Sequence, residues 1–382
     1  MQLKPIRQWG WTIPDDDLIL IAGPCSAETR EQTLASCQGA ARQGAHMLRA
    51  GIWKPRTRPD AFAGVGEEGL PWIVEAGQTT GCPVMIEVAS ARHVELALKA
   101  GVDILWIGAR STANPFTVQE IADVLNGVDV PVLVKNPVNP DLDLWLGAIE
   151  RIALAGVHRL AAIFRGFSVY KPGIYRNAPM WELPIELHRQ LPALDIIVDP
   201  SHITGNRSLI GYVAQHAIDL DFSGFMIETH IQPDQAWSDA AQQLTPMDLG
   251  RTLAGLVHRR PNVDDPEFLA NLEALRYDID NLDQEIIRSL GQRMEVSREI
   301  GLFKRENEVT ILQMNRWSNI FESRVQTALK AGLSEAFARD LIQAIHNESI
   351  RQQGGVMNAE LEMTPKDQRD LSEMDQPVEN QI

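Results

Sequence analysis

Cysteine is scarce in this sequence, and only Cys25, Cys37 and Cys82 occur among its 382 residues. Three widely spaced cysteines do not form a disulfide framework, so we expect free thiols. No apolar run reaches the roughly 18 residues that a membrane-spanning helix needs. The opening segment, MQLKPIRQWGWTIPDDD, also lacks the apolar core of a signal peptide. We therefore expect a cytoplasmic protein without membrane contact.

Basic residues are in the minority, since 35 Lys and Arg face 51 Asp and Glu and the formal net charge is −16. Nucleic acids and anionic membranes need a positive protein surface, so this balance argues against both as partners. A site for anionic small molecules must therefore gather a local cluster of cations. Apolar residues (44%) and charged residues (23%) occur in the proportions of a globular protein, and the length suits about two domains.

Short apolar, β-branched runs recur through residues 1–260, with helical stretches between most of them. The predicted strands cover residues 18–23, 46–52, 83–89, 103–109, 131–137, 160–166, 195–201 and 224–230. Near-continuous apolar strands are typical of a parallel sheet that is covered on its outside. Eight such units in roughly 260 residues match the size of a closed (β/α)8 barrel. An open, doubly wound parallel sheet is the alternative that periodicity leaves open.

The segment RRPNVDDPEF (259–268) is polar and contains proline, and β-type runs stop after it. Amphipathic helical spacing follows, for example at Ile279, Leu282 and Ile286. The predicted segments are a linker at 261–267, an all-α domain at 268–355 and an acidic tail at 356–382. Helices are expected near residues 269–306, 313–331 and 334–353. The tail is polar enough that we expect it to be disordered.

Polar residues follow successive predicted strands, where a β/α barrel builds its active site. Charged side chains are costly to bury without partners, so this pattern is hard to explain by structure alone. One set suits the phosphate and carboxylate groups of a substrate, and it consists of Arg49, Lys54, Arg56, Arg110, Lys135 and Arg165. A second set of sulfur, nitrogen and oxygen donors fits a divalent transition ion, and it consists of Cys25, His202, Glu228 and Asp239.

The motifs AGPCS, LRAG, KPRT, GARS, VKN, FRG, DPSH and IETH occur in this order. Over about residues 15–260 the sequence thereby resembles the type I, β-subgroup 3-deoxy-D-arabino-heptulosonate 7-phosphate (DAHP) synthases, which are TIM barrels. The resemblance implies one divalent transition metal ion (Mn, Fe, Co or Zn) per barrel, held by Cys25, His202, Glu228 and Asp239. It implies that phosphoenolpyruvate contacts Arg49, Lys54, Arg110, Lys135 and Arg165. It implies that erythrose 4-phosphate contacts Arg56 and Thr57.

The reaction implied is an aldol-like addition, in which carbon 3 of phosphoenolpyruvate attacks the aldehyde of erythrose 4-phosphate. The metal acts as a Lewis acid on that aldehyde, and Lys54 is the candidate proton donor to the new alkoxide. The related octulosonate-type synthases, which use arabinose 5-phosphate, share GPC, but KPRT disfavours this alternative. The sequence departs from the family at Ala240, since Ser-Asp-Gly is usual where Ser238-Asp239-Ala240 stands. No regulatory domain precedes the barrel, so we expect any regulation to come from elsewhere.

Four further residues of the barrel have simpler interpretations. Cys37 and Cys82 are expected to be structural thiols of the core. His230 is either a partner behind the metal ligands or a satisfied core histidine. Glu87 is expected to pair with a basic neighbour rather than to orient water.

In the helical domain, Arg293 and Lys304 are 11 residues apart and fall within about 20° of one another around a helix. Arg276 lies roughly 100° from Arg293. Ser349 and Gln353 are four residues apart and share a helix face. Each of these side chains alone is most simply a solvated surface residue.

The combination resembles the AroQ-class chorismate mutases over about residues 268–353. The resemblance implies carboxylate contacts for Arg276, Arg293 and Arg316, ether-oxygen contacts for Lys304 and Gln353, and a further substrate contact for Ser349. In this family the partner subunit supplies the first arginine, so we expect a homodimer through the helical domain. Gln313 and Trp317 stand where carboxylates are usual.

Together the two resemblances predict a bifunctional enzyme of the shikimate pathway. The barrel would make DAHP, and the helical domain would rearrange chorismate to prephenate by stabilising charge on the breaking ether bond. Prephenate or chorismate is the expected feedback inhibitor of the synthase. The alternative is an active synthase whose helical domain is mainly a regulatory ligand sensor.

Overall fold

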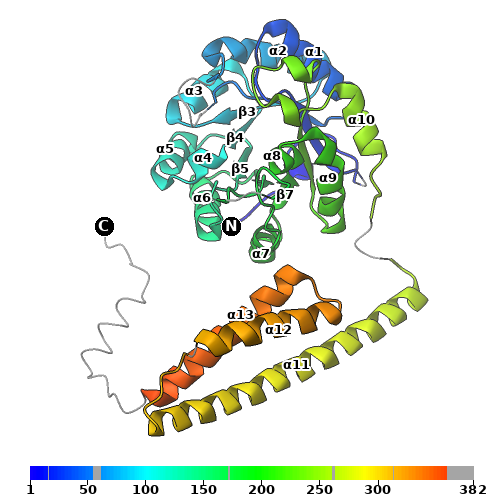
Figure 1. Cartoon of the computed structure of the whole chain (residues 1–382). Helices are drawn as coiled ribbons and strands as arrows, with labels where there is room; N and C mark the ends of the chain where they lie inside the picture. Colours follow the sequence, from blue (N-terminus) through cyan, green and yellow to red (C-terminus); the bar gives the residue numbers. More distant parts are fainter. Residues whose placement is uncertain (16, 55–61, 171–172, 260–262, 313, 359–382) are drawn as a thin grey trace. The chain divides into compact units, whose positions relative to one another are not determined.

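The computed structural model of the chain describes residues 1–358, except for residues 16, 55–61, 171–172, 260–262 and 313 (Figure 1). The chain divides into two compact units, Met1–Pro261 and Asn262–Ile382, and each is described by itself. Within the described residues, no helix is long and apolar enough to cross a membrane.

The first unit is a closed barrel of parallel strands in the order β1 to β8, and β8 pairs with β1. The strands are β1 (Ile19–Gly23), β2 (Met47–Ala50), β3 (Val84–Val88), β4 (Ile104–Ile107), β5 (Val132–Lys135), β6 (Leu160–Phe164), β7 (Asp195–Val198) and β8 (Gly224–Glu228). Every one of them lies inside a predicted run. The prediction of a closed (β/α)8 barrel is confirmed, and the open sheet is excluded because β1 and β8 are hydrogen-bonded neighbours.

Helices surround the strands on the outside (Figure 1). Those of the described barrel unit are α1 (Arg30–Arg42), α2 (Leu70–Thr80), α3 (Ala91–Ala100), α4 (Ala109–Thr112), α5 (Pro115–Leu125), α6 (Leu142–Leu154), α7 (Glu182–Gln190), α8 (Pro200–Thr204), α9 (Ile210–Asp219) and α10 (Pro246–Ala254). The short 3₁₀ helices are η1 (Ile6–Gln8), η2 (Gly66–Gly69), η3 (Arg207–Leu209), η4 (Pro233–Gln235) and η5 (Ala240–Gln242). Several helices begin at a side-chain cap that satisfies their first backbone amides, as Thr29 does for α1 and Asp141 for α6.

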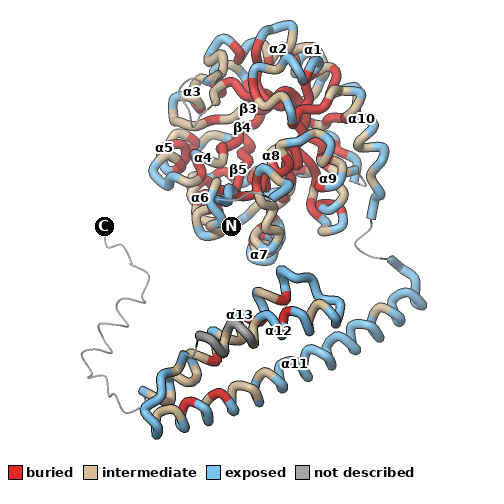
Figure 2. Tube along the Cα trace, in the orientation of Figure 1, coloured by how far each residue is buried: buried red, intermediate tan, exposed pale blue. Residues whose placement is uncertain are grey.

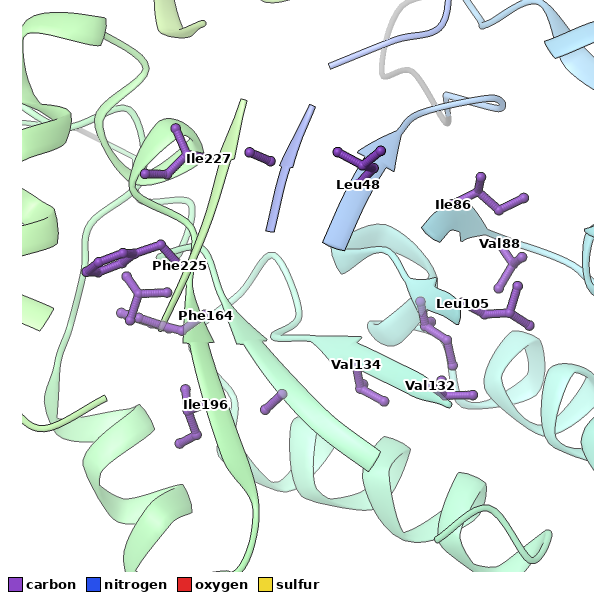
Figure 3. Close-up of a cluster of buried hydrophobic side chains, with 14 of the residues drawn as sticks. Leu48, Ile86, Val88, Leu105, Val132, Val134, Phe164, Ile196, Phe225 and Ile227 are labelled. Atoms are coloured by element: carbon purple, nitrogen blue, oxygen red, sulfur yellow. The ribbon is translucent and has the colours of Figure 1, made fainter. Parts of the chain in front are cut away.

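Both faces of the sheet are buried, which explains why its strands are almost wholly apolar (Figure 2). Alternate residues of each strand point to opposite faces. In β4, Leu105 packs outward against the helices, whereas Trp106 points into the barrel. Figure 3 shows the outward set, with Ile86, Val134 and Phe225 among its members.

The amino-terminal segment contributes to the inner core. Ile6, Trp9 and Ile13 are buried with the inward side chains of the strands. The backbone amide of Ile6 donates to Oδ2 of Asp195, the first residue of β7, at 2.6 Å. This segment therefore lies at the amino ends of the strands, and apolar side chains fill that end of the barrel.

The second unit is helical, as predicted, with α11 (Pro266–Glu306), α12 (Met314–Lys330) and α13 (Glu335–Met357) in its described part. Both α11 and α12 pack against α13. The approach of α11 to α13 is close at Gly301, where a Cβ atom would lie 3.0 Å from Cα of Gln353. The amino-terminal half of α11 is exposed along its length (Figure 2).

Candidate active sites

Strand alternation places charged side chains inside the barrel at its carboxyl end. In six strands, a residue of the inner apolar core is followed two positions later by a charged residue that points the same way. These charged residues are Arg49, Glu87, Lys135, Arg165, Asp199 and Glu228. Because unpaired charges are costly to bury, each should have a partner of opposite charge or a hydrogen bond.

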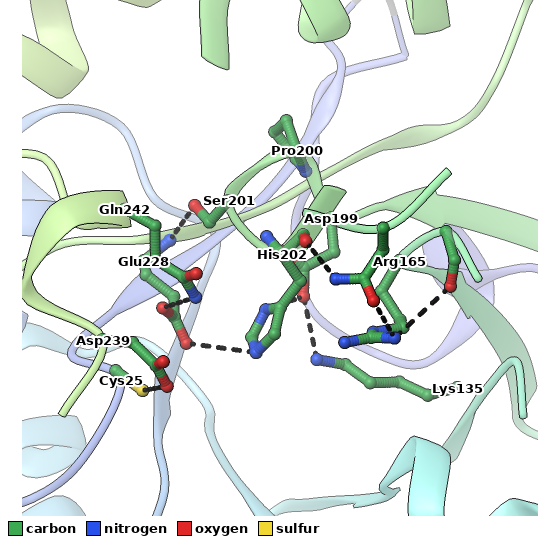
Figure 4. Close-up of polar contacts among 12 residues, drawn as sticks. Cys25, Lys135, Arg165, Asp199, Pro200, Ser201, His202, Glu228, Asp239 and Gln242 are labelled. Carbon is green, nitrogen blue, oxygen red and sulfur yellow. Dashed lines mark hydrogen bonds and ion pairs between the residues drawn. The ribbon is translucent and has the colours of Figure 1, made fainter. Parts of the chain in front are cut away.

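Asp199 joins two parts of this rim (Figure 4). Its Oδ2 accepts a hydrogen bond from Lys135 Nζ at 2.8 Å and lies 2.8 Å from Nδ1 of His202. Its Oδ1 accepts from the backbone amide of His202 at the start of α8. Burial opposes the charge of this carboxyl, but His202 and Lys135 hold its pKa well below the usual range. Asp199 therefore stays ionised and orients the Lys135 ammonium and the His202 imidazole.

Arg165 is also buried, and its Nη1 donates to Oδ1 of Asn177 at 2.9 Å. Burial lowers the pKa of Arg165 to about 10, so the guanidinium remains charged at neutral pH. Arg110 lies on α4 and is exposed, and its charge adds to the lowering of that pKa. Two predicted phosphate-binding cations thus act on the same region of the rim.

Arg49 and Lys54 approach the predicted metal ligands rather than open solvent. Arg49 Nη1 lies 3.3 Å from Oε1 of Glu228, and its guanidinium lies 4.9 Å from the ring centroid of Trp106. Lys54 Nζ donates to Sγ of Cys25 at 3.0 Å. Burial opposes the charge on Lys54, but Cys25 and Glu228 raise its pKa, so it remains an ammonium.

The predicted metal ligands meet as two pairs. Cys25 Sγ lies 3.3 Å from Oδ2 of Asp239, and His202 Nε2 lies 3.7 Å from Oε1 of Glu228 (Figure 4). Across the part of the chain that the structure describes, no three His, Cys, Asp or Glu side chains are placed to hold one ion. The four predicted donors are therefore neighbours without forming a complete coordination sphere.

The donors nevertheless fit a metal ion in kind. Glu228 Oε1 is fully buried and accepts no hydrogen bond, although Arg49 Nη1 lies 3.3 Å from it, so this oxygen could coordinate an ion. Burial lowers the pKa of His202, so its imidazole is neutral at pH 7 and can act as a ligand. Burial and the nearby Glu228 raise the pKa of the Cys25 thiol to about 12. A bound cation would favour the thiolate, and this mixed set suits Mn, Fe, Co or Zn.

Two residues that sequence reasoning missed lie next to these donors. Arg176 Nη1 donates to Oδ1 of Asp239 at 2.8 Å and to Oε1 of Gln242 at 2.7 Å. Gln242 Nε2 in turn donates to Oε2 of Glu228 at 2.7 Å. Neither residue lies at the end of a strand. The expectation that functional residues follow the strands of a β/α barrel therefore did not point to them.

The residues with simpler interpretations lie away from direct contact with the donors. Cys37 is buried in the outer apolar core, and Cys82 packs against it. His230 is buried and its Nε2 lies 3.4 Å from Oε2 of Glu28, whose Oε1 accepts from the backbone amide of Trp237. This pair connects the segment after β8 to the segment after β1.

The helical unit contains a pocket of about 380 Å³ between its helices. Among the lining residues that the structure describes, none is acidic, whereas three are cationic: Arg293, Lys304 and Arg324. Burial and the nearby Arg324 lower the pKa of Arg293. Such mutual repulsion favours an anionic occupant. Arg324 was not predicted, because one arginine on an amphipathic helix gives no distinguishing signal.

The polar residues predicted for this domain line the same pocket. Arg293 Nη1 donates to Oγ of Ser349, and Lys304 Nζ donates to Oε1 of Gln353 at 3.2 Å. Arg276 lies elsewhere on α11, where it is exposed and pairs with Glu273 at 2.7 Å. This placement agrees with the angular offset expected from the sequence.

Some predicted positions fall outside this description. Arg56, Thr57 and Gln313 lie outside the described residues, and so does the side chain of Arg316. Trp317 is described, and its ring stacks on that of His346 with centroids 3.4 Å apart and an interplanar angle of 11°. Both rings line the pocket. An aromatic pair therefore occupies the position at which the chorismate mutases usually have a carboxylate.

Comparison with known families separates the two units in the same way. The model of the DAHP synthetase I family matches residues 10–260. The chain belongs to this family. A second model, chorismate mutase type II, matches residues 275–354, so the DAHP synthetase domain is followed by a chorismate mutase domain.

The DAHP synthetase domain is also similar to individual aldolases of 3-deoxy sugar acid phosphates. Phospho-2-dehydro-3-deoxyheptonate aldolase of Thermotoga maritima is 33% identical over 225 residues, which cover 59% of this chain and 64% of that enzyme. Its crystal structure matches with a TM-score of 0.55 at 30% identity, covering 63% of this chain and 69% of that one. A 2-dehydro-3-deoxyphosphooctonate aldolase of Methylobacterium radiotolerans is 26% identical and covers 63% of this chain and 88% of that enzyme. The sequence match thus spans just under two thirds of the Thermotoga enzyme.

Proposed function

We propose that the barrel condenses phosphoenolpyruvate with erythrose 4-phosphate to give DAHP and inorganic phosphate. The observation that carries this proposal is the ring of buried cations on an acidic protein. Arg49, Lys135 and Arg165 are 1%, 4% and 9% exposed, and all three point into the carboxyl end of the barrel. Cations kept charged in a largely dry site suit two anionic substrates.

Different side chains of this rim would bind phosphoenolpyruvate, donate a proton and hold the metal ion. Lys135 and Arg165, with Arg110 at the edge, would hold the phosphate and carboxylate of phosphoenolpyruvate, and Arg49 would add charge from the side of Glu228. Carbon 3 of phosphoenolpyruvate then bonds to the aldehyde carbon, water adds at carbon 2 and phosphate leaves. Lys54, held as an ammonium, would donate a proton to the new alkoxide. A divalent ion held by Cys25, His202, Glu228 and Asp239 would supply Lewis acidity.

The choice of aldose phosphate is part of this proposal. The resemblance to the β-subgroup and the motif KPRT favour erythrose 4-phosphate, and Arg56 and Thr57 of that motif would contact it. The octonate relatives make arabinose 5-phosphate the alternative. Measuring the rate with each sugar phosphate at equal concentration decides between them, and faster turnover of arabinose 5-phosphate would contradict the proposal.

For the helical domain, we propose chorismate mutase activity in the cationic pocket. Arg293, with Arg316 and Arg276, would bind the two carboxylates. Lys304 and Gln353, which share a hydrogen bond, would stabilise the charge that builds on the breaking ether oxygen. The rearrangement needs no nucleophile, which fits a pocket lined by cations and amides.

Arg276 belongs to such a site only in a homodimer, and the surface of α11 supports one. Leu275, Ile279, Leu282 and Ile286 lie on one face and are each more than half exposed. A long apolar stripe that no described residue of the chain covers is typical of a subunit interface. A second copy covering it would also bring its own arginine to the first copy's pocket.

The stacked pair of Trp317 and His346 favours a second candidate, a sensor that binds chorismate or prephenate and inhibits the synthase. Burial and then Arg293 lower the pKa of His346, so the pair is uncharged. It would contact the ring of a ligand without fixing its hydroxyl as a carboxylate does. We propose feedback inhibition by prephenate in either case, and a synthase rate unaffected by millimolar prephenate would contradict it.

Two variants of the full chain test the assignment of one reaction to each unit. Cys25→Ala should remove synthase activity and leave chorismate consumption unchanged. Arg293→Ala should lower chorismate consumption by about 10²–10³-fold and leave the synthase unchanged, since a positioned charge is lost from the pocket alone. Parallel losses in either variant would contradict the assignment. A wild-type chain that binds chorismate without converting it would establish the sensor.

A further inference from the structure

We propose that Arg176 and Gln242 are positioning residues that hold the two carboxylates of the metal site, Glu228 and Asp239, in the orientation that an ion requires. The inference rests on the metal site proposed above. Neither residue is among the proposed ligands or substrate contacts. Together they form one continuous hydrogen-bonded bridge between carboxylates that come from different segments.

The bridge uses one oxygen of each carboxylate. Arg176 Nη1 donates to Oδ1 of Asp239 (2.8 Å) and to Oε1 of Gln242 (2.7 Å). Gln242 Nε2 donates to Oε2 of Glu228 at 2.7 Å (Figure 4). Gln242 is 1% exposed, so its amide is shielded from bulk solvent. Both of its polar atoms are therefore committed to the bridge.

The other oxygen of each carboxylate faces the remaining donors. Asp239 Oδ2 lies 3.3 Å from Sγ of Cys25, and Glu228 Oε1 lies 3.7 Å from Nε2 of His202. Glu228 Oε1 is the buried atom that accepts no hydrogen bond. The bridge thus fixes the outer oxygens and directs the inner oxygens toward the sulfur and the imidazole. Outer partners of this kind set the orientation of metal ligands.

Arg176 is itself anchored on the helix that carries His202. The amide of Arg176 donates to the carbonyl of Thr204 in α8 (3.3 Å), and Nδ2 of the next residue, Asn177, donates to the carbonyl of His202 at 2.6 Å. Gly205 leaves room for this approach, because a Cβ atom there would lie 2.6 Å from Cβ of Arg176. The same segment therefore fixes three of the four predicted donors.

Charge and position predict opposite effects of removing Arg176. A nearby guanidinium repels a divalent cation, so Arg176→Met would tighten metal binding if charge alone mattered. If Arg176 holds the carboxylates in place, the same change weakens binding. Gln242→Met is close in shape and changes no charge, so it tests position alone.

The experiment measures the dissociation constant of Co²⁺ by chelator competition on the metal-free full chain, together with the visible absorption of the bound ion. We expect Arg176→Met and Gln242→Met each to weaken binding by about 10–100-fold and to change the absorption bands. Arg176→Lys, which keeps one donor, should recover part of the affinity. The matched control Arg259→Met removes an Arg–Asp pair with Asp219 that touches no donor, and it should bind as the wild type does.

Thermal unfolding with chelator present shows whether each variant is folded before metal is added. Wild-type affinity in folded Gln242→Met, or equal or tighter binding in folded Arg176→Met, would overturn the inference and leave the metal site standing. A wild-type chain that binds no divalent ion would instead overturn the metal site and this inference with it.

Discussion

Asp199 contacts both halves of the barrel's rim, because its carboxylate contacts Lys135 on one side and His202 on the other. It is fully buried. His202, Lys135 and Arg49 sustain its charge against the cost of burial. Asp199 belongs to the DPSH motif in the predicted strand 195–201, but strand position does not say which side chains meet across the barrel, so this role was not predictable.

Removing that charge should destabilise the barrel. Asp199→Asn leaves Lys135 buried without a carboxylate, and breaking a buried pair in this way costs about 3–5 kcal/mol. Urea unfolding followed by tryptophan fluorescence measures this change in the barrel, where all but Trp317 of the nine tryptophans lie. A change below about 1 kcal/mol, the value of an exposed ion pair, would show that the pair is not buried in solution.

The depressed pKa of Asp199 also predicts a pH dependence. As pH falls through about 4, the carboxyl ionises less in the unfolded chain but remains ionised in the folded barrel. The unfolded state then binds more protons, so the free energy of unfolding decreases as the pH is lowered through this window. Above the window, the stabilisation from Asp199 is present in full. Measured between about pH 6 and pH 3, the slope should be smaller for Asp199→Asn. Identical slopes would contradict the assignment.

Among the elements, those with a strict pattern were predictable. Each strand of the barrel is buried on both faces, so its apolar run is continuous and marks its position. The segment that carries Arg176 and Asn177 has no such pattern. Its partners are Asp239 and His202, 63 and 25 residues further along the chain, and only the folded barrel brings them together.

For the long helix α11, the sequence predicted the element but not its partner. Its apolar spacing predicted a helix, and that prediction is confirmed. Spacing alone does not say what covers the apolar face. In the described chain, α13 packs against α11, yet Leu275, Ile279, Leu282 and Ile286 stay exposed. We therefore propose that a second copy of the chain covers these side chains.

Charge placed in this stripe should separate the subunits. Leu282→Glu would bury a carboxylate in an apolar interface, so we expect a monomer by light scattering after size-exclusion chromatography. Mutase activity should be lost with the dimer, while synthase activity remains. Gln284→Glu, about 140–180° around the helix from the residues of the stripe, is the matched control and should stay dimeric. A wild-type chain that is already monomeric would contradict the proposal.

At the scale of the whole molecule, two units with different chemical needs share one chain. The barrel gathers sulfur, imidazole and carboxylate donors beside buried cations, within a chain of net charge −16. The described lining of the helical pocket offers cations and the Gln353 amide, and the rearrangement proposed for it requires no metal. We propose that these are two separate active sites with separate requirements.

Assays of both reactions on the purified full chain, before and after complete metal removal, test whether the two sites work independently. We predict that the chelated protein loses condensation of phosphoenolpyruvate with erythrose 4-phosphate and regains it with Mn²⁺ or Co²⁺, while conversion of chorismate to prephenate is unchanged. Synthase activity that survives metal removal, or mutase activity that falls in parallel with it, would contradict the account.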